Sequence, residues 1–324
     1  MSTFPAFSFT TTADEVATAF AQEIQGKNVL ITGCSLNGLG CETARVIAKH
    51  ANLVIITGYN GERLKLSEDA IKKEVPNANI RPLNLDLSSF AAVRKAAAEV
   101  NAYSEPIHVL IHNAAAGVLP LRFTVDGLET QIATDHIGPF LFTKLIVAKL
   151  LAATTPSYTP RVVFVSSVAH SFGSGIDFDA ITHPNAETYT DENAYYMAKC
   201  ANILTAIELS KRSKGAIHAY SLHPGVIGTN ITQRKESVSA LQAMGILGPD
   251  ELPNTKDFPW KTIAQGAATT VAASFDPRIS NKPGSYLDDS QIANEAVAAH
   301  SSDPANAERL WTLTEEMIGE EFTF

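Results

Sequence analysis

The chain is poor in cysteine, in basic residues and in long apolar runs. Its 324 residues include three cysteines, Cys34, Cys41 and Cys200, whose number and spacing suit neither a disulfide framework nor a metal site. There are 25 basic against 34 acidic residues, a net charge of −9, and no basic run, so nucleic acid and anionic membranes are poor partners. We expect packed thiols in a reducing compartment, no bound metal and no nucleic-acid partner.

Targeting signals are also missing from the sequence. No N-terminal stretch joins a basic start to an apolar core, and no apolar run reaches the ~18 residues of a membrane span. The longest candidate, PFLFTKLIVAKLLAA, is interrupted by Lys144 and Lys149 and suits an amphipathic helix. We therefore expect a cytoplasmic protein without a membrane span.

What the chain does have is a regular alternation of apolar runs and helical periods. VLIT, NLVIIT, IHVLIH and RVVFVS are short buried-strand runs, and each is followed by a segment of helical pattern. This alternation predicts an α/β fold: a single doubly wound (Rossmann) domain of about seven parallel strands flanked by helices. We assign residues 1–25 to an N-terminal extension with a short helix, and residues 26–324 to the domain.

Three helices are predicted with particular features. Asp14 is a candidate cap for a helix over 14–24, and a helix is expected over 193–213. A long helix around 124–153 contains Pro139, which should kink it. Residues 230–258 break the alternation with prolines and glycines, which predicts a substrate lid.

A glycine-bearing turn lies between the first strand and its helix. Val29–Ile31 precede Gly33, Gly38 and Gly40 in the segment VLITGCSLNGLG. Glycines allow the backbone to approach a ligand's phosphates, and the helix that starts near Gly40 directs its N-terminal amides at them. The pattern is typical of a dinucleotide-binding loop.

Tyr195 and Lys199 are separated by one helical turn in YYMAKCANIL. Residues four apart share one helix face, so the Lys199 ammonium can lie beside the Tyr195 phenol and favour its ionised form. The serine pair Ser166-Ser167 ends an apolar run shortly before, and a hydroxyl of Ser167 could bind a reacting oxygen. These groups predict a proton-transfer site for alcohol–ketone interconversion.

These segments together resemble the short-chain dehydrogenase/reductase family over nearly the whole chain, and most closely its retinol dehydrogenase and WW-domain oxidoreductase branch. TGCSLNGLG is similar to the family's TGxxxGxG loop with one extra residue, HNAAAG to NNAG, YYMAK to YxxxK, and HPGVIGT to PGxxxT. The resemblance implies Ser167, Tyr195, Lys199 and Asp135 as the catalytic set. It implies a cofactor site formed by Gly33, Ser35, Asn37, Gly38, Leu39, Gly40, Tyr59, Asn60, Arg63, Asp86, Leu87, Asn113, Ala114, Ala115, Tyr195, Lys199, Pro224, Gly225, Val226 and Thr229.

Asp135 departs from the family pattern, and the residues after the second strand decide which cofactor is accepted. Asp135, in TDHIGPF, stands where the family has asparagine, and its charge should pair with Lys199. After the second strand no carboxylate appears before Glu62, so nothing rejects a 2′-phosphate, and Asn60, Arg63 and Lys65 are its candidate partners. We expect NADP(H), with NAD(H) as the alternative.

The sequence as a whole predicts an NADP-dependent alcohol dehydrogenase or carbonyl reductase. By family resemblance its substrate is a hydrophobic alcohol, aldehyde or ketone, such as a secondary metabolite, and the protein is a homodimer paired through the helices that carry Asp135 and Tyr195. The alternative is an NADPH-binding regulatory protein with vestigial turnover.

Overall fold

The computed structural model describes residues 4–324, and its centre is an eight-stranded sheet in the order β10-β9-β6-β5-β4-β1-β2-β3. Seven strands are parallel: β1 (Asn28–Ile31), β2 (Leu53–Gly58), β3 (Ile80–Asn84), β4 (Val109–His112), β5 (Arg161–Val165), β6 (His218–Leu222) and β9 (Tyr286–Asp288). The two-residue β10 (Gln291–Ile292) turns back antiparallel to β9. The strand order reverses between β1 and β4, as in a doubly wound sheet, so the predicted fold class is confirmed.

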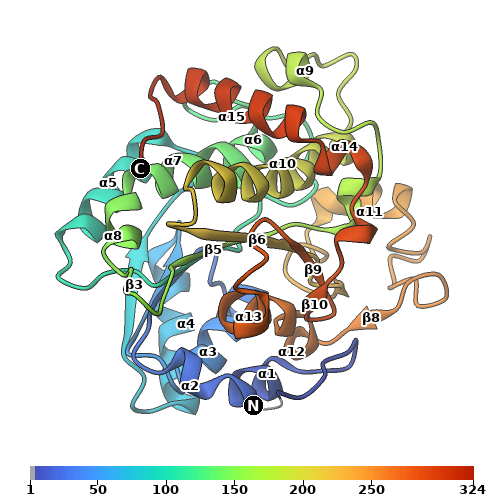
Figure 1. Ribbon diagram of the computed structural model, residues 1–324. Helices are drawn as coiled ribbons and strands as arrows, with labels where there is room; N and C mark the ends of the chain where they lie inside the picture. Colours follow the sequence, from blue (N-terminus) through green and yellow to red (C-terminus); the bar gives the residue numbers. More distant parts are fainter. Residues whose placement is uncertain (1–3) are drawn as a thin grey trace.

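Helices cover both faces of the sheet (Figure 1). Each face has its own cluster of buried apolar side chains, because the central strands are buried on both sides. One face carries α1 (Ala13–Ala19), α3 (Leu39–Ile47), α4 (Gly61–Glu74), α12 (Ile263–Gly266) and α13 (Ala268–Phe275). The other carries α5 (Phe90–Ala102), α7 (Gly138–Leu145), α8 (Val147–Leu151), α10 (Asp191–Arg212) and α15 (Pro304–Ile318).

The N-terminal helix begins at a different residue from the one predicted. Thr12, rather than Asp14, caps α1, and it forms a reciprocal capping box with Glu15. Asp14 lies inside the first turn and pairs with Arg45 and Lys49 of the α3 region. The predicted single helix over 14–24 is two short helices, α1 and α2 (Ala21–Ile24), and α1 packs against α3 and α13.

The prediction of one long helix over 124–153 was wrong. Residues 124–129 form a turn, and helical structure starts with α6 (Thr130–Ile132), capped by Glu129. A π-helical turn, η1 (Ala133–Ile137), then leads into α7 and α8. Pro139 closely follows this π-helical turn within continuous helical backbone, so its missing N–H coincides with the interruption of regular α-helical hydrogen bonding. Asp135 lies within the π-helical turn, a feature frequent at functional sites.

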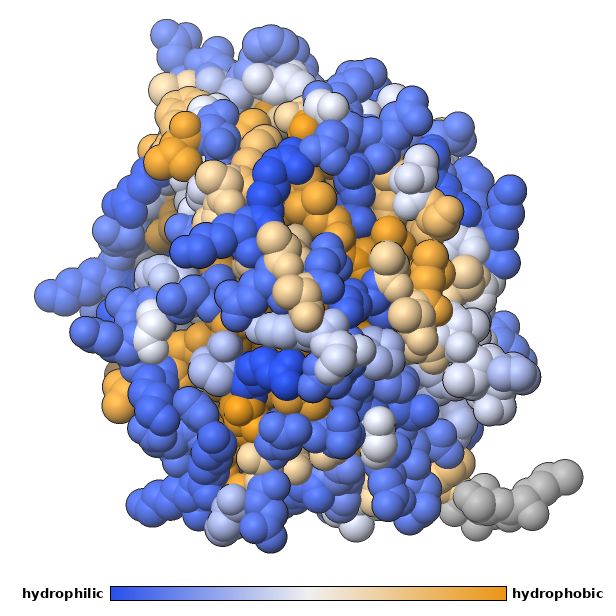
Figure 2. All heavy atoms as spheres, turned by 90° about the vertical axis from the view of Figure 1, so that its left-hand side faces the viewer, coloured by the Kyte–Doolittle hydropathy of each residue, from blue (hydrophilic) through white to orange (hydrophobic). Residues whose placement is uncertain are grey.

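The β3 edge and the α7–α10 side of the fold have distinct surroundings. The β3 edge, on the side viewed in Figure 2, contains Pro82, which cannot donate a ladder hydrogen bond, and Arg81, which pairs with Glu105 (2.8 Å). Helix α15 packs along α10, and its Trp311 lies on Phe140 of α7 (4.7 Å between ring centroids).

Three histidines are buried in neutral hydrogen-bonded positions. His112 bonds the Thr143 hydroxyl (2.7 Å), and His136 bonds that of Thr314 (2.8 Å). His223 accepts from the Val168 amide (3.1 Å). Burial lowers the pKa of each imidazole to about 3. No cluster of metal-ligating side chains occurs within residues 4–324.

We expect the free energy of unfolding to fall as the pH drops from 7 to 5. In the unfolded chain these imidazoles bind protons below about pH 6.5, whereas in the folded chain they stay neutral to about pH 3. The stabilisation is therefore complete above about pH 6.5 and is lost below it, by at most ~1.4 kcal/mol per pH unit for each histidine. Urea unfolding at pH 7, 6 and 5 measures the slope.

Two variants control the pH experiment. His136→Gln should flatten the slope, because a group that no longer titrates contributes nothing to it. His183→Gln should leave the slope unchanged, because the His183 side chain is 79% exposed. Equal stability at pH 7 and pH 5 in the wild-type protein would contradict the prediction.

Candidate active site

The predicted site residues meet at the carboxyl ends of four neighbouring strands. Gly33 follows β1, Asn113 follows β4, Ser167 follows β5, and Pro224 follows β6. In a doubly wound sheet this edge, at the reversal of strand order, is where ligands bind. Segments almost 200 residues apart in the chain are thereby brought to one place.

The glycine loop is packed so closely that side chains are excluded. A Cβ on Gly33, whose φ is +73°, would lie 2.6 Å from the Cα of Ala114, and one on Gly40 would lie 2.5 Å from Nδ2 of Asn113. That Asn113 amide donates to the carbonyl of Gly33 (3.1 Å) and so fastens the loop to the end of β4. Asn37 takes a left-handed conformation (φ 58°) within the lengthened loop.

The start of α3 suits the pyrophosphate of a dinucleotide. Its N-cap is Gly38, which offers no side-chain cap, so the first-turn amides are not bonded by the cap residue. Those amides and the helix dipole favour an anion. Asn230, at the start of the 230–258 segment, donates to the carbonyl of Leu36 (2.7 Å) and so connects that segment to the glycine loop.

The adenosine end of the expected cofactor site lies after β2 and β3. Tyr59 is 64% exposed, and its hydroxyl accepts from the Arg63 guanidinium (3.5 Å). The side-chain oxygen of Asn60 caps α4, which leaves its amide group for a ligand. Asp86 accepts two hydrogen bonds from Ser88 through Oδ1.

Helix α10 holds Tyr195 and Lys199 on one face. The Lys199 ammonium lies 5.3 Å from the centroid of the Tyr195 ring and is 3% exposed. Thr190 caps the helix through its side chain, fixing its first turn ahead of Tyr195. The arrangement keeps a cation beside the phenol in a site from which water is largely excluded.

Asp135 forms a buried ion pair with Lys199. Its Oδ2 lies 2.9 Å from Lys199 Nζ, and its Oδ1 accepts from the Ala116 amide (2.7 Å). Burial by itself would lower the pKa of Lys199, but the Asp135 charge, the Tyr195 side chain and the hydrogen bond to Asp135 together raise it. Lys199 therefore stays protonated, with its charge shared between Asp135 and the tyrosine.

The two serines after β5 have different surroundings. The Ser166 hydroxyl is buried and donates to the Lys199 carbonyl (2.7 Å), which holds β5 against α10. The Ser167 hydroxyl accepts from the Ala169 amide (3.2 Å) and lies in a partly exposed side chain. The hydroxyl hydrogen of Ser167 is not used in this bond, so Ser167 can donate it to a bound oxygen.

Residues 230–258 pack beside Tyr195 and the glycine loop. The segment contains η3 (Lys235–Ser237) and α11 (Val238–Ala243), seen with β8 (Trp260–Lys261) at the right of Figure 1. Leu241 and Leu247 form an apolar cluster with Val118, against which Tyr195 packs. Val118 directly follows the HNAAAG motif, which points to its place near the site. Ala116 and Ser166 also lie in motif segments, but their hydrogen bonds to Asp135 and to the Lys199 carbonyl could not be inferred from those motifs.

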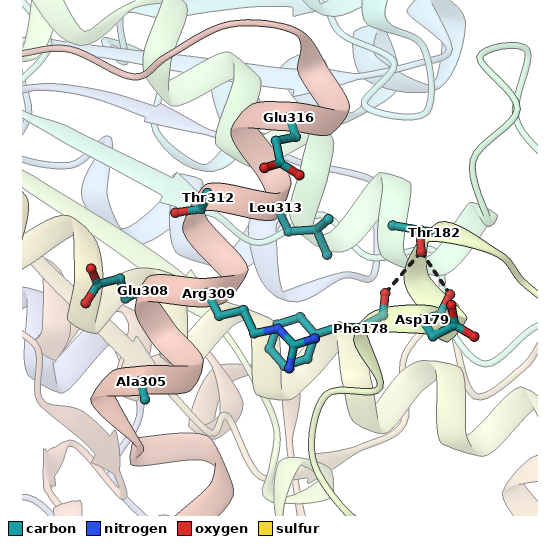
Figure 3. Close-up of a pocket in the computed structure, with 9 residues that line it drawn as sticks. All are labelled: Phe178, Asp179, Thr182, Ala305, Glu308, Arg309, Thr312, Leu313 and Glu316. Carbon is teal, nitrogen blue, oxygen red and sulfur yellow. Dashed lines mark hydrogen bonds between the residues drawn. The ribbon is translucent and has the colours of Figure 1, made fainter.

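A separate cavity of about 670 Å³ lies between α15 and α9 (Phe178–Thr182), away from the catalytic residues. Figure 3 shows Arg309 across the ring of Phe178, at 4.0 Å from the ring centroid, with Glu308 and Glu316 on the same helix. None of the four predicted catalytic residues lines it. It is an open surface groove rather than the reaction site.

The fold and the site define an oxidoreductase of the doubly wound, nucleotide-dependent class. Residues 27–176 match the family model for short chain dehydrogenase. The chain belongs to the short-chain dehydrogenase/reductase family.

Two relatives and one solved structure illustrate the similarity. The chain is 34% identical to the chloroplastic short-chain dehydrogenase TIC 32 A of Brassica napus, covering 89% of this chain and 88% of that one. It is 31% identical to retinol dehydrogenase 12 of Mus musculus, covering 92% and 88%. A short-chain dehydrogenase from Escherichia coli CFT073, complexed with NADPH, has the same fold, with a TM-score of 0.61, 20% identity and coverage of 83% and 98%.

The structure also bears on the cysteines and on membrane insertion. All three cysteines are free and buried, and burial raises the pKa of each thiol, to about 11 for Cys200. No helix within residues 4–324 has the length and apolarity needed to cross a membrane.

Proposed function

We propose that this protein is an NADP(H)-dependent dehydrogenase/reductase acting on a hydrophobic alcohol, aldehyde or ketone. The observation that carries the proposal is the group formed by Tyr195, Lys199 and Asp135 beside the partly exposed hydroxyl of Ser167. Such a group can move a proton to or from an oxygen atom at near-neutral pH. The tight glycine loop and the uncapped start of α3 fit a dinucleotide.

In the reductive direction, residues of the chain bind the reacting oxygen and transfer the proton to it. NADPH supplies the hydride when bound. The Ser167 hydroxyl donates to the substrate's carbonyl oxygen and polarises it. The Tyr195 hydroxyl gives its proton to that oxygen, and the Lys199 ammonium stabilises the phenolate that remains. Oxidation runs the same steps backwards, with Tyr195 as the base.

A hydrophobic substrate is supported by the surface around Tyr195. Val118, Leu241 and Leu247 give this region an apolar wall, and the exposed apolar side chains Val168 and Phe172 follow Ser167. We propose that residues 230–258 act as the substrate lid, since an apolar segment over a reaction site excludes water from it.

The decisive experiment is a carbonyl panel assayed for NADPH and NADH oxidation. Turnover of apolar aldehydes or ketones supports the proposal. NADPH binding without turnover of any alcohol, aldehyde or ketone would favour the alternative, a regulatory protein with vestigial activity. The observation behind that alternative is the charge of Asp135, which pairs with Lys199.

NADPH should bind more tightly than NADH. No carboxylate precedes Glu62 after β2, and the Arg63 guanidinium is on the surface beside Tyr59. Arg63→Ala should weaken NADPH binding about ten-fold, which corresponds to one charge-assisted hydrogen bond of about 1.5 kcal/mol. NADH binding should hardly change. Nucleotide fluorescence titrations measure both affinities.

Lys65→Ala is the matched control for Arg63→Ala. Lys65 lies on the same helix but pairs with Asp69 (2.8 Å), so its loss should change neither affinity. Tighter binding of NADH than NADPH by the wild-type protein would refute the preference and would direct attention to Glu62 as the ribose partner.

The cytoplasmic location and the homodimer stay predictions. The predicted homodimer pairs through the helices that carry Asp135 and Tyr195. Sedimentation velocity at several protein concentrations measures the state of association.

A further inference from the structure

One of the contacts between the lid and the catalytic centre is made to the backbone of residues 114–118. Ser237 donates to the carbonyl of Val118 (2.8 Å) from a buried hydroxyl, and Arg234 donates to the carbonyl of Ala116. A Cβ on Gly117, whose φ is +90°, would lie 3.2 Å from the Ile231 side chain, so this side chain of the lid rests directly on the loop. The loop is therefore shared between the lid and the site.

The same loop is held from its other side by Asp135. The Ala116 amide donates to Oδ1 of Asp135 (2.7 Å), and Oδ2 of that carboxylate accepts from Lys199 (2.9 Å). Ala116 is thus bonded at its carbonyl by the lid and at its amide by the catalytic ion pair. Arg234, Ala116, Asp135 and Lys199 form one continuous hydrogen-bonded chain.

We infer that Arg234 is a positioning residue, which couples closure of the lid to the placement of Asp135 and Lys199 beside Tyr195. The inference rests on the proposed function. Arg234 is partly buried, and its guanidinium reaches a backbone carbonyl rather than a carboxylate, so its bond depends on the loop's position alone. A second contact of the lid, the ion pair of its Glu236 with Arg122 (2.9 Å), is half exposed and does not reach Asp135.

The coupling predicts a particular kinetic signature for Arg234→Ala. Mutations along a coupled network change the coupled step by about 3- to 30-fold, so kcat for an accepted carbonyl substrate should fall by that factor. KM should change less than about two-fold, because the apolar lid cluster is intact. Arg234→Lys, which keeps a cationic donor, should recover most of the loss.

A double-mutant cycle with Asp135→Asn separates positioning from simple lid damage. If Arg234 acts through Asp135, its removal should cost much less in the Asp135→Asn background than in the wild-type protein. Lys235→Ala is the matched control, because Lys235 is the exposed neighbour of Arg234 and should show no effect in either background. Additive effects, or a rise in KM with kcat unchanged, would overturn the inference.

Hydrogen exchange provides a readout that needs no turnover. Peptides covering 112–119 should exchange faster in Arg234→Ala than in the wild-type or Lys235→Ala proteins, because the loop loses its carbonyl contact. Unchanged exchange there would show that Arg234 does not hold the loop. If the wild-type protein turned over no carbonyl compound, the proposed function would fail. The exchange experiment would still show whether Arg234 holds the loop at residues 112–119.

Discussion

Replacing Tyr195 with phenylalanine should remove nearly all turnover while leaving NADPH affinity within a few-fold of wild type. The ring still packs against Val118 and Leu241, so the lid cluster is retained. The hydroxyl that transfers the proton is lost, and general acid–base catalysis contributes about 10²–10⁴-fold. Steady-state rates for the best substrate of the carbonyl panel, with NADPH binding measured in parallel, check both parts.

The neighbouring tyrosine is the natural control for this prediction. Tyr196 is on the same helix, but its ring packs edge-on against Phe172 (5.5 Å between centroids) rather than beside Lys199. Tyr196→Phe should keep most of the activity, because that contact needs only the ring. If Tyr195→Phe keeps more than about a tenth of the rate, a group other than Tyr195 supplies most of the proton transfer.

The fold and the cofactor loop were predictable because local patterns determine them. Buried parallel strands read as apolar runs, and the turn after β1 needs glycine where Gly33 and Gly40 touch the end of β4. The placement of Tyr195 and Lys199 followed from helical spacing alone, since α10 runs unbroken through both.

Helix starts were less predictable, for a physical reason. Thr12 and Asp14 are both good capping residues, and Glu15, three residues after Thr12, decided between them by completing a capping box. Before Thr130 the helical pattern of the sequence is overridden by tertiary contacts, since Glu129 uses its carboxylate to cap α6 and to accept from the Tyr189 hydroxyl (3.1 Å).

The pairing of Asp135 with Lys199 was predicted and is confirmed, but other contacts between distant segments could not be read from the sequence. The Ala116 amide and Asp135 are 19 residues apart, and Arg234 is 118 residues from Ala116. No spacing rule connects them, because the sheet and the π-helical turn bring them together. The charge on Asp135 was visible in the sequence, but its role depends on these partners.

Exchanging Asp135 for asparagine should move the inflection of the pH–rate profile to lower pH, by about one unit or more. Removing an anion 2.9 Å from Lys199 Nζ strengthens the cation's effect on the Tyr195 phenolate. The asparagine oxygen can still accept from the Ala116 amide, so the loop should keep its place. Profiles measured in the direction of alcohol oxidation, at saturating cofactor, would compare the two proteins.

A structural role for the ion pair would give a different result. Breaking a buried pair leaves an uncompensated charge and can cost about 3–5 kcal/mol, so the Tm of Asp135→Asn should fall even if catalysis is untouched. Asp191→Asn changes a carboxylate in the first turn of α10, the helix that carries Lys199, without contact to Lys199, and it should alter neither the profile nor the Tm appreciably. A lower Tm with an unmoved pH–rate profile would make Asp135 a structural partner of Lys199, outside the proton path.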